Sequence, residues 1–264
     1  LSSSNDRFRT REILITGASS GIGKALAIHY ASTGVKLILV GRNKDRLQQV
    51  AKEVTYKGAE AEYFQQDIRD QVKIRELILA HPDLDMIFVN AGISIGGLSP
   101  ESNEYEAASR NIFETNLTGA INCIHPAIDV MRSKSQSPSK EKVIAVICSL
   151  AGYRGLPSSP AYSASKAGLK AYCEGLIPHA ARMGIQLSVI NPGFVESGIT
   201  DKNNFTMPFF MPASKAAEII SDAISKRKTS ISFPWQMRFL CGLVRALPTS
   251  LALRLLGRTK AQKG

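Results

Sequence analysis

Three side chains in the second half of the chain are of types that could together transfer a proton. Ser149 ends an apolar run that begins at Val143, Tyr162 lies 13 residues further on, and Lys166 follows four residues later. Residues four apart lie on one face of a helix, so the phenol and the ammonium are predicted neighbours. A nearby cation favours the phenolate and lowers the pKa of a tyrosine, ordinarily about 10, toward the range of an acid–base catalyst. The serine hydroxyl could then hold a substrate oxygen.

A glycine-rich turn near the start of the chain could bind a phosphate group. It reads Thr16-Gly17-Ala18-Ser19-Ser20-Gly21-Ile22-Gly23 and lies between two apolar runs, 13–15 and 25–28. Glycine lets the backbone approach a pyrophosphate, and the free N–H groups at a helix start attract an anion. The glycine spacing departs from the usual Gly-x-Gly-x-x-Gly fingerprint. A turn that only joins a buried strand to a helix is therefore the alternative interpretation.

Apolar segments typical of strands alternate with helical segments along most of the chain. The predicted strands are 13–16, 35–40, 61–65, 86–89, 143–149, 186–190 and 229–233, and the predicted helices are 24–32, 45–56, 71–80, 104–131, 162–181 and 214–228. We expect the prolines to bend the fourth helix near Pro126 and to bend or break the fifth at Pro178. Continuous apolar strands predict an α/β fold with a doubly wound parallel sheet, a three-layer Rossmann arrangement. Ligands bind at the carboxyl ends of such strands.

The turn after the second strand indicates which dinucleotide would bind. NAD-binding folds commonly place an acidic residue there for the ribose hydroxyls, whereas this chain has Gly41, Arg42 and Asn43. A guanidinium grips a phosphate with two parallel hydrogen bonds. The sequence therefore predicts NADP(H) rather than NAD(H), with an arginine in a solvated loop as the alternative.

The turns after the third and fourth strands also suit a cofactor. Asp67 and Ile68 offer a carboxylate for the adenine amine and an apolar side chain for its ring, although an aspartate after a strand is often only a helix cap. The small residues of Asn90-Ala91-Gly92 would let a ligand pass close to the backbone, but they are also ordinary turn residues.

In combination these motifs resemble the short-chain dehydrogenase/reductase family, in its single-domain form, from about residue 12 to residue 197. The glycine spacing of residues 16–23 is that of the family's cofactor loop, and Asp67-Ile68 and Asn90-Ala91-Gly92 match two further cofactor motifs. Pro192-Gly193-Phe194-Val195 matches the loop beside the nicotinamide, with Ser197 where relatives often have threonine. Ser149, Tyr162 and Lys166 match the catalytic residues, and Asn116 matches the asparagine that kinks a helix and holds a water.

The resemblance implies a hydride transfer between a nicotinamide and a carbonyl carbon. Tyr162 would exchange the proton with the substrate oxygen and Ser149 would hydrogen-bond that oxygen. Lys166 would lower the pKa of the tyrosine and bind the nicotinamide ribose, and Asn116 would link Lys166 to solvent through water. The substrate would be a small ketone or secondary alcohol, lipid-like or otherwise apolar. The alternative is a catalytically silent NADP(H)-binding scaffold or a redox-sensing protein, which would have no need of all four residues.

Cysteine usage predicts a cytoplasmic protein. The four cysteines are far apart and form no Cys-x-x-Cys, which is typical of reduced thiols in the cytoplasm. The four histidines lack metal-ligand spacing, so we expect no metal. No apolar run is long enough to span a membrane, and the start, Leu1-Ser-Ser-Ser-Asn, lacks the apolar core of a signal peptide. Relatives in the family often associate, which predicts a homo-oligomer, a dimer or a tetramer; the unusual Pro178 leaves the standard tetramer open.

The end of the chain is basic and amphipathic. No acidic residue follows Asp222, whereas nine lysines and arginines do, so residues 1–225 carry only about +2 of the net +11. We expect a catalytic domain over 1–233, with an apolar substrate lid over about 198–228, and a basic amphipathic extension over 234–264. Apolar residues from Trp235 to Leu247 recur at helical spacing, which fits a helix on an anionic membrane surface. Packing on the protein itself or on a second subunit is the alternative. The leucine-rich composition argues against nucleic acid.

Overall fold

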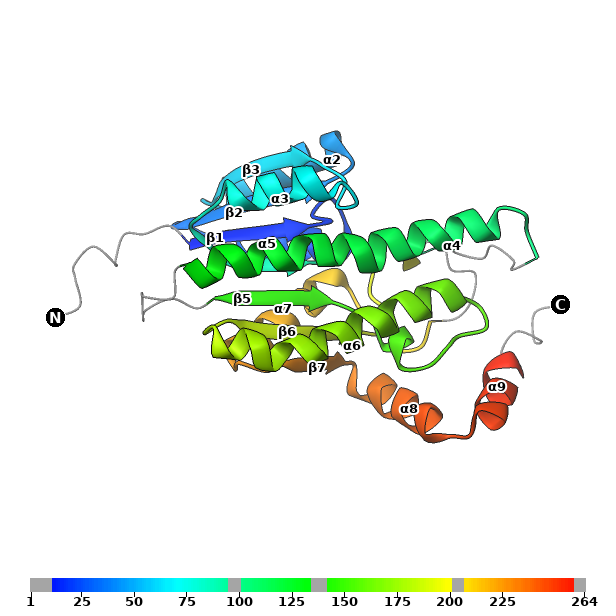
Figure 1. The fold of residues 1–264 in the computed structure, drawn as a ribbon. Coiled ribbons are helices and arrows are strands. Elements are labelled where there is room, and N and C mark those ends of the chain that lie inside the picture. The colour runs from blue at the N-terminus through cyan, green and yellow to red at the C-terminus, as the bar shows by residue number, and fades with distance from the viewer. Residues whose placement is uncertain (1–10, 95–100, 134–141, 201–206, 259–264) are drawn as a thin grey trace.

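Seven parallel strands form one sheet in the order β3-β2-β1-β4-β5-β6-β7 (Figure 1). The computed structural model describes residues 11–94, 101–133, 142–200 and 207–258. The strands are β1 (Arg11–Thr16), β2 (Val35–Gly41), β3 (Glu60–Gln65), β4 (Leu84–Val89), β5 (Val143–Ile147), β6 (Gln186–Pro192) and β7 (Ser230–Phe233). The predicted doubly wound parallel sheet is confirmed. Because β4 pairs with β1 and not with β3, the strand order reverses beside β1, where such sheets bind their ligands.

Helices cover both faces of the sheet, which explains why the strands are apolar along their whole length. On one face, α1 (Gly21–Tyr30), α2 (Lys44–Tyr56) and α7 (Ala213–Ser225) pack against alternate strand residues such as Ile13 and Leu37. On the other, α3 (Gln71–Leu79), α5 (Gly119–Ser133) and α6 (Pro160–Arg182) pack against the intervening residues, such as Leu14 and Ile38. These four strand side chains are fully buried. The site is thus mounted on a rigid core.

The fourth predicted helix is interrupted at Asn116, where the family resemblance implied a kink. It comprises α4 (Tyr105–Phe113), a π-helical turn at Glu114–Thr118 and α5, which continues through the buried Pro126. The irregular hydrogen bonding therefore lies at the turn that contains Asn116, not near the proline. The side chain of Asn116 bonds to another segment of the chain, and single π turns are frequent at functional sites.

Of the predicted bend or break at Pro178, the break does not occur, because α6 continues to Arg182. A proline removes the hydrogen bond to the carbonyl four residues earlier, here that of Glu174. Glu174 and Pro178 are both exposed, so water can serve that carbonyl. The buried side chains of Cys173 and Ala180 hold the helix against the sheet on the opposite side.

Two helices follow the last strand. They are α8 (Trp235–Ala246) and α9 (Thr249–Arg258), separated at Pro248 as the sequence predicted. Within the described ranges, no helix is both long enough and apolar enough to cross a bilayer. All four cysteines are free, and Cys123, Cys148 and Cys173 are buried. Phe205 of the predicted substrate lid, and Lys260 and Lys263 of the predicted basic extension, lie outside the described residues.

Candidate active site

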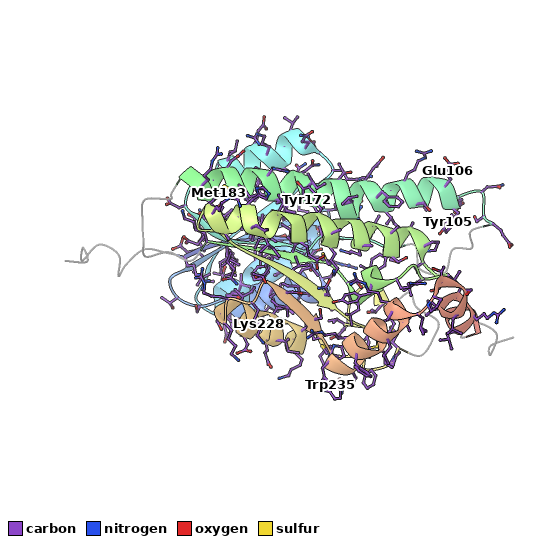
Figure 2. The ribbon with its side chains drawn as sticks, turned by 60° about the horizontal axis from the view of Figure 1, so that its bottom comes forward. Tyr105, Glu106, Tyr172, Met183, Lys228 and Trp235 are labelled. Carbon is purple, nitrogen blue, oxygen red and sulfur yellow. The ribbon has the colours of Figure 1, made fainter. Side chains whose placement is uncertain are left out.

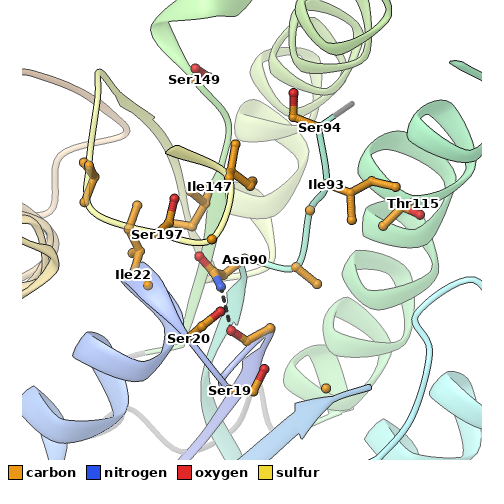
Figure 3. Close-up of a pocket in the computed structure, with 18 of the residues that line it drawn as sticks. Ser19, Ser20, Ile22, Asn90, Ile93, Ser94, Thr115, Ile147, Ser149 and Ser197 are labelled. Atoms are coloured by element: carbon orange, nitrogen blue, oxygen red, sulfur yellow. Dashed lines mark hydrogen bonds between the residues drawn. The ribbon is translucent and has the colours of Figure 1, made fainter. Parts of the chain in front are cut away.

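A cleft of about 370 Å³ lies at the carboxyl edge of the sheet, formed by the turns that follow β1 to β6. In Figure 3 the residues of the glycine-rich turn, Ser19 and Ser20, lie at one end and Ser149 lies at the other, with Asn90 between them. An elongated cleft with phosphate-binding features at one end and hydroxyl groups at the other suits a dinucleotide with a small reactant beside it.

Nearly all of the predicted site residues line this one cleft. The lining includes Gly17, Ser19, Ser20, Gly21, Ile22, Arg42, Asn43, Asp67, Ile68, Asn90, Ala91, Gly92, Ser149, Tyr162, Lys166, Pro192, Gly193, Val195 and Ser197. Gly23 and Asn116 are not part of the lining; both are buried behind it. The sequence reasoning missed Arg46, Ser94, Thr115 and Cys148, which also line the cleft. Thr115 and Cys148 each adjoin a predicted residue, but no spacing rule singled them out.

The glycine-rich turn has the close approaches that a bound pyrophosphate needs. Gly17 and Gly21 have positive φ angles of 66° and 53°. A Cβ atom on Gly17 would lie 2.9 Å from the Cα atom of Ala91, and one on Gly21 would lie 2.8 Å from the Cβ atom of Ser197. Gly23 lets α1 pack against the loop, since a Cβ atom added at this position would lie 2.3 Å from the carbonyl oxygen of Gly17. The residues present therefore fit a dinucleotide in this cleft.

Hydrogen bonds tie the turns after β1 and β4 together. The Thr16 hydroxyl oxygen accepts from the backbone N–H groups of Asn90 and Ala91, at 3.0 and 3.1 Å. In return, the Asn90 side-chain amide donates to the carbonyl oxygens of Thr16 and Gly17, at 3.0 and 3.3 Å. The asparagine after β4 is thus held by the glycine loop and shapes the floor of the cleft (Figure 3).

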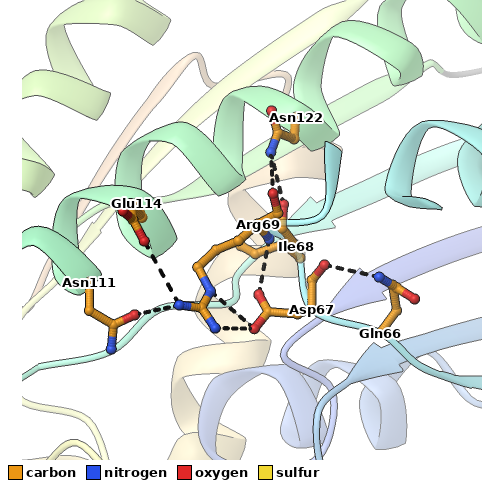
Figure 4. A network of polar contacts seen from close by, with 7 residues as sticks. All are labelled: Gln66, Asp67, Ile68, Arg69, Asn111, Glu114 and Asn122. Atoms are coloured by element: carbon orange, nitrogen blue, oxygen red, sulfur yellow. Dashed lines mark hydrogen bonds and ion pairs between the residues drawn. The ribbon is translucent and has the colours of Figure 1, made fainter. Parts of the chain in front are cut away.

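The carboxylate of Asp67 is bound by Arg69, which the sequence reasoning did not consider. The guanidinium donates through Nε and Nη2 at 3.1 and 2.7 Å, and the backbone N–H of Arg69 adds a bond of 3.0 Å. These bonds lower the pKa of Asp67. The same guanidinium reaches Asn111 at 2.8 Å and lies 3.9 Å from the carboxylate of Glu114, at the start of the π turn (Figure 4). Arg69 thus links the predicted adenine end of the cleft to the helix that carries Asn116.

Two guanidinium groups, Arg42 and Arg46, lie at the predicted ribose end of the cleft. Asn43 between them is the N-cap of α2, and its side-chain oxygen accepts from the backbone N–H of Arg46 at 2.9 Å. Within the part of the chain that the structure describes, neither guanidinium forms an ion pair with a carboxylate. This end of the cleft therefore combines a helix N-terminus with two available cations, an environment that favours an anion.

Ser149, Tyr162 and Lys166 meet at the end of β5. The Ser149 oxygen accepts from the backbone N–H of Ala151 at 3.1 Å, and its hydroxyl also hydrogen-bonds with Tyr162. The Lys166 ammonium is buried, donates to the carbonyl oxygen of Ile147 at 2.8 Å and lies 6.0 Å from the centroid of the Tyr162 ring. A serine, a phenol and an ammonium at one strand end form an arrangement suited to proton exchange with a substrate oxygen.

The pKa of Tyr162 is shifted in the direction opposite to the one expected. Burial raises the pKa of the Tyr162 phenol, and hydrogen bonding with Ser149 acts in the opposite direction. Burial also lowers the pKa of Lys166. A net lowering of the tyrosine pKa is therefore not present in this structure, because desolvation of the phenolate outweighs the neighbouring groups. Burial raises the pKa of Cys148 to about 12, so this thiol stays protonated beside the site.

Asn116 holds the segment that follows β4 in place. Its side-chain oxygen accepts from the backbone N–H of Ile93 at 2.8 Å, and its amide donates to the Ile93 carbonyl at 2.9 Å and to the Ser165 hydroxyl at 3.2 Å. A Cβ atom on Gly92 would lie 3.2 Å from the Asn116 oxygen and 3.4 Å from the Lys166 nitrogen. A side chain at position 92 would therefore require Asn116 to shift by a few tenths of an ångström.

Comparison with known proteins agrees with this geometry. The family model for short chain dehydrogenases matches residues 11–207. An uncharacterized oxidoreductase of Myxococcus xanthus is 34% identical over 245 residues, which cover 91% of this chain and 94% of the relative. A 3-oxoacyl-acyl-carrier-protein reductase of Staphylococcus aureus is 31% identical over 198 residues, which cover 73% of this chain and 77% of the relative.

Solved structures share the fold. A short chain dehydrogenase from Burkholderia cenocepacia in complex with NADP superposes with a TM-score of 0.79 at 20% identity, covering 94% of this chain and 98% of that one. A relative from Burkholderia phymatum in complex with NAD has a TM-score of 0.78 at 24% identity, covering 89% and 93%.

The fold and the site thus define an α/β oxidoreductase that acts on CH–OH and C=O groups with a nicotinamide dinucleotide. The chain belongs to the short-chain dehydrogenase/reductase family, as a single-domain, NAD(P)-dependent member.

Proposed function

We propose that this protein is an NADP(H)-dependent oxidoreductase that transfers a hydride between the nicotinamide and a ketone or secondary alcohol of apolar character. The observation that carries the proposal is the meeting of Ser149, Tyr162 and Lys166 at one end of a cleft whose other end is the glycine-rich turn. A relative that is 31% identical is named as a 3-oxoacyl reductase, which is consistent with a carbonyl substrate.

The preference for NADP(H) rests on Arg42 and Arg46. Both line the cleft at the turn after β2, where a carboxylate would instead repel a phosphate. Two guanidinium groups and the N-terminus of α2 together offer a set of N–H donors for a 2′-phosphate. Solved structures of the same fold hold either NAD or NADP, so the fold alone does not determine the cofactor.

The remaining cofactor contacts are assigned from the lining of the cleft. The backbone of the glycine-rich turn would hold the pyrophosphate, and Asp67 with Ile68 would hold the adenine. Asn90, Ala91 and Gly92 would pass beneath the cofactor, and the segment Pro192-Gly193-Phe194-Val195 would lie beside the nicotinamide. Gly23 contributes indirectly, by letting α1 pack against the loop. When bound, the nicotinamide supplies or accepts the hydride.

In the reduction, Tyr162 donates its proton to the substrate oxygen, and in the oxidation it accepts that proton. Ser149 donates its hydroxyl hydrogen to the same oxygen in place of its hydrogen bond with Tyr162, while its own oxygen is held by Ala151. The buried Lys166 binds the nicotinamide ribose and places a positive charge near the tyrosine. The side chain of Asn116 bonds to Ile93 and Ser165 and so holds the site in shape. We also assign to Asn116 the link from Lys166 to solvent through water.

The test is a panel of carbonyl compounds (steroids, long-chain ketones, 3-keto acyl esters and quinones) monitored by the absorbance of NADPH, with NADH alongside. We expect oxidation of NADPH with at least one class, and loss of more than nine tenths of the rate in Tyr162→Phe while NADPH still binds. Tyr56→Phe, on a side chain that is 94% exposed, is the control. Binding of NADPH without oxidation across the whole panel would favour the silent scaffold instead.

We further propose a cytoplasmic homo-oligomer that associates peripherally with a membrane through the basic extension at 234–264. The catalytic domain would comprise residues 1–233, with a substrate lid within 198–228. Phe209 and Phe210 are both about half exposed just before Met211, which pairs with Val195 at the cleft, and this supports an apolar entrance. Light scattering of the purified protein tests the oligomer.

A further inference from the structure

The end of β7 and the start of α8 rest on the two loops that border the catalytic end of the cleft. The backbone N–H of Gly193 donates to the carbonyl of Phe233 at 2.7 Å, and the Cδ atom of Pro234 lies against Gly193. The Tyr153 hydroxyl bonds to the Ser232 hydroxyl at 3.0 Å. Tyr153 ends the short 3₁₀ helix η3 (Leu150–Tyr153), which begins directly after Ser149. The start of α8 therefore lies next to the loops that carry the reacting groups.

The far end of α8 is anchored to the same loop. The Arg154 guanidinium donates to the carbonyl oxygen of Arg245 at 3.3 Å. The Arg245 guanidinium in turn lies 5.9 Å from the centroid of the Tyr153 ring. α8 therefore has a defined orientation relative to the cleft, with one side attached to η3 and the other side turned away from it.

The side that faces away carries large apolar side chains. None of the twelve residues of α8, which lies wholly within the described ranges, is buried. Trp235, Phe239 and Leu243 follow at intervals of four and are 73%, 61% and 51% exposed, so they form one stripe. Leu251 and Leu255 continue the apolar surface on α9. Figure 2 shows Trp235 at the outer edge of the molecule, pointing away from the sheet. We call these five residues the apolar stripe.

The charged residues of α8 and α9 are all positive. Arg238 and Arg254 are exposed, and within the described part of the chain neither forms an ion pair with a carboxylate. No acidic residue follows Asp222 in the sequence. A second copy of this surface would bring two positive surfaces together without an anion between them, which opposes self-association. An anionic lipid bilayer offers both the apolar interior and the negative charge that this surface lacks.

We propose that α8 and α9 dock on an anionic bilayer through the apolar stripe and its arginines, and that the catalytic cleft receives its substrate from that bilayer. Delivery of the substrate from the bilayer rests on the proposed function. The substrate class is an amphiphile that dissolves in lipid and carries a ketone or secondary alcohol. The attachment of the start of α8 to η3 and to Gly193 supports this delivery, since docking would hold the loops at the catalytic end of the cleft one helix away from the lipid surface.

Sedimentation with vesicles tests the docking without any turnover. We expect the full chain to bind vesicles of phosphatidylcholine with about one third phosphatidylglycerol. The bound fraction should be at least fivefold lower with vesicles of phosphatidylcholine alone. Binding should weaken as salt is raised, because exposed charges are screened. A variant with Trp235→Ser, Phe239→Ser and Leu243→Ser should lose at least fivefold of the bound fraction. Arg238→Glu with Arg254→Glu should lose the preference for the anionic lipid.

The matched control replaces exposed apolar residues elsewhere on the molecule. Tyr56→Ser, Val72→Ser and Leu79→Ser change three exposed side chains of α2 and α3 and should leave vesicle binding unchanged. Thermal unfolding of both triple variants checks that each is folded. Equal sedimentation of the full chain and the stripe variant would overturn the docking. So would a dimer of the full chain, seen by light scattering, that becomes a monomer in the stripe variant.

Turnover of two substrates tests the delivery of substrate from the bilayer separately. The ratio of rates for a long-chain 3-keto ester held in anionic vesicles and a short-chain 3-keto ester in the buffer should fall at least fivefold in the stripe variant. An unchanged ratio, with vesicle binding lost, would overturn delivery from the bilayer. If neither ester is turned over, both the delivery of substrate from the bilayer and the proposed function are contradicted. The docking is judged on sedimentation alone.

Discussion

The Lys166 ammonium donates a 2.8 Å hydrogen bond to the backbone carbonyl of Ile147, the last residue of β5. Ser149 follows two residues later, so one strand end holds both the cation and the hydroxyl of the catalytic site. The lysine is buried, and burial lowers its pKa. Its position therefore depends on this backbone carbonyl and on the glycine at position 92, which leaves room for it.

Ser149→Ala should lower the rate and shift the pH profile. Loss of one donor to the reacting oxygen costs about 100- to 1,000-fold in kcat. The hydrogen bond from Ser149 lowers the pKa of Tyr162, so its removal raises that pKa further. The alcohol oxidation needs the phenolate, and its alkaline rise should move to higher pH. Profiles of kcat/KM against pH measure the shift. Ser149→Thr, which keeps a hydroxyl, should restore the profile; an unmoved profile in the alanine variant would exclude this contact.

Arg42→Ala and Arg46→Ala should each raise KM for NADPH about tenfold, which corresponds to about 1.4 kcal/mol. The KM for NADH should stay nearly constant, because NADH has no 2′-phosphate to lose. Lys44→Ala is the matched control, since Lys44 lies between the two arginines in sequence but is absent from the lining of the cleft. Steady-state kinetics with both cofactors provide the measurement. A parallel rise in both KM values would assign the arginines to general binding rather than to cofactor choice.

Asn116→Ala should destabilise the protein as well as slow it. The substitution leaves the N–H and C=O groups of Ile93 without their partner. Each buried backbone group left unpaired costs about 1–3 kcal/mol. The expected fall in Tm is about 2–4 °C per kcal/mol for a chain of this size. Asn103→Ala, at an exposed position before α4, is the control for calorimetry. Equal Tm values for the two variants would contradict the positioning role.

Two helical glycines should respond in opposite directions to alanine. In Gly23→Ala the new Cβ atom would meet the carbonyl oxygen of Gly17 at 2.3 Å, so α1 must move away from the cofactor loop. We expect a loss of about 1–3 kcal/mol and weaker NADPH binding. Gly175 in α6 has open space around the same position, and Gly175→Ala should stabilise the protein by about 0.5–1 kcal/mol. Denaturant unfolding and cofactor titration distinguish the two. A neutral Gly23→Ala would mean that the loop tolerates a side chain.

The fold and most of the site could be predicted from the sequence because they depend on local patterns. Apolar runs without alternation predicted strands covered on both faces, and α helices and turns followed at the expected places. The spacing of Tyr162 and Lys166 depends only on helix geometry. The positive φ angles of Gly17 and Gly21 are local features of the turn, although their close approaches to Ala91 and Ser197 are tertiary. Such features involve residues close in sequence, and the family's characteristic spacing made them specific.

Tertiary structure decided what depends on contacts between distant segments. The bidentate contact from Arg69 to Asp67 and its reach to Asn111 join two parts of the chain that no sequence pattern relates. The helix continues through Pro178 because Glu174, whose carbonyl loses its helical donor, is an exposed residue that water can reach, which the sequence does not reveal. The pKa of Tyr162 is raised because desolvation depends on everything packed around the phenol, whereas the spacing of Tyr162 and Lys166 reports only one neighbour. Sequence determined which groups are present and in what order, and packing determined the environment in which each must act.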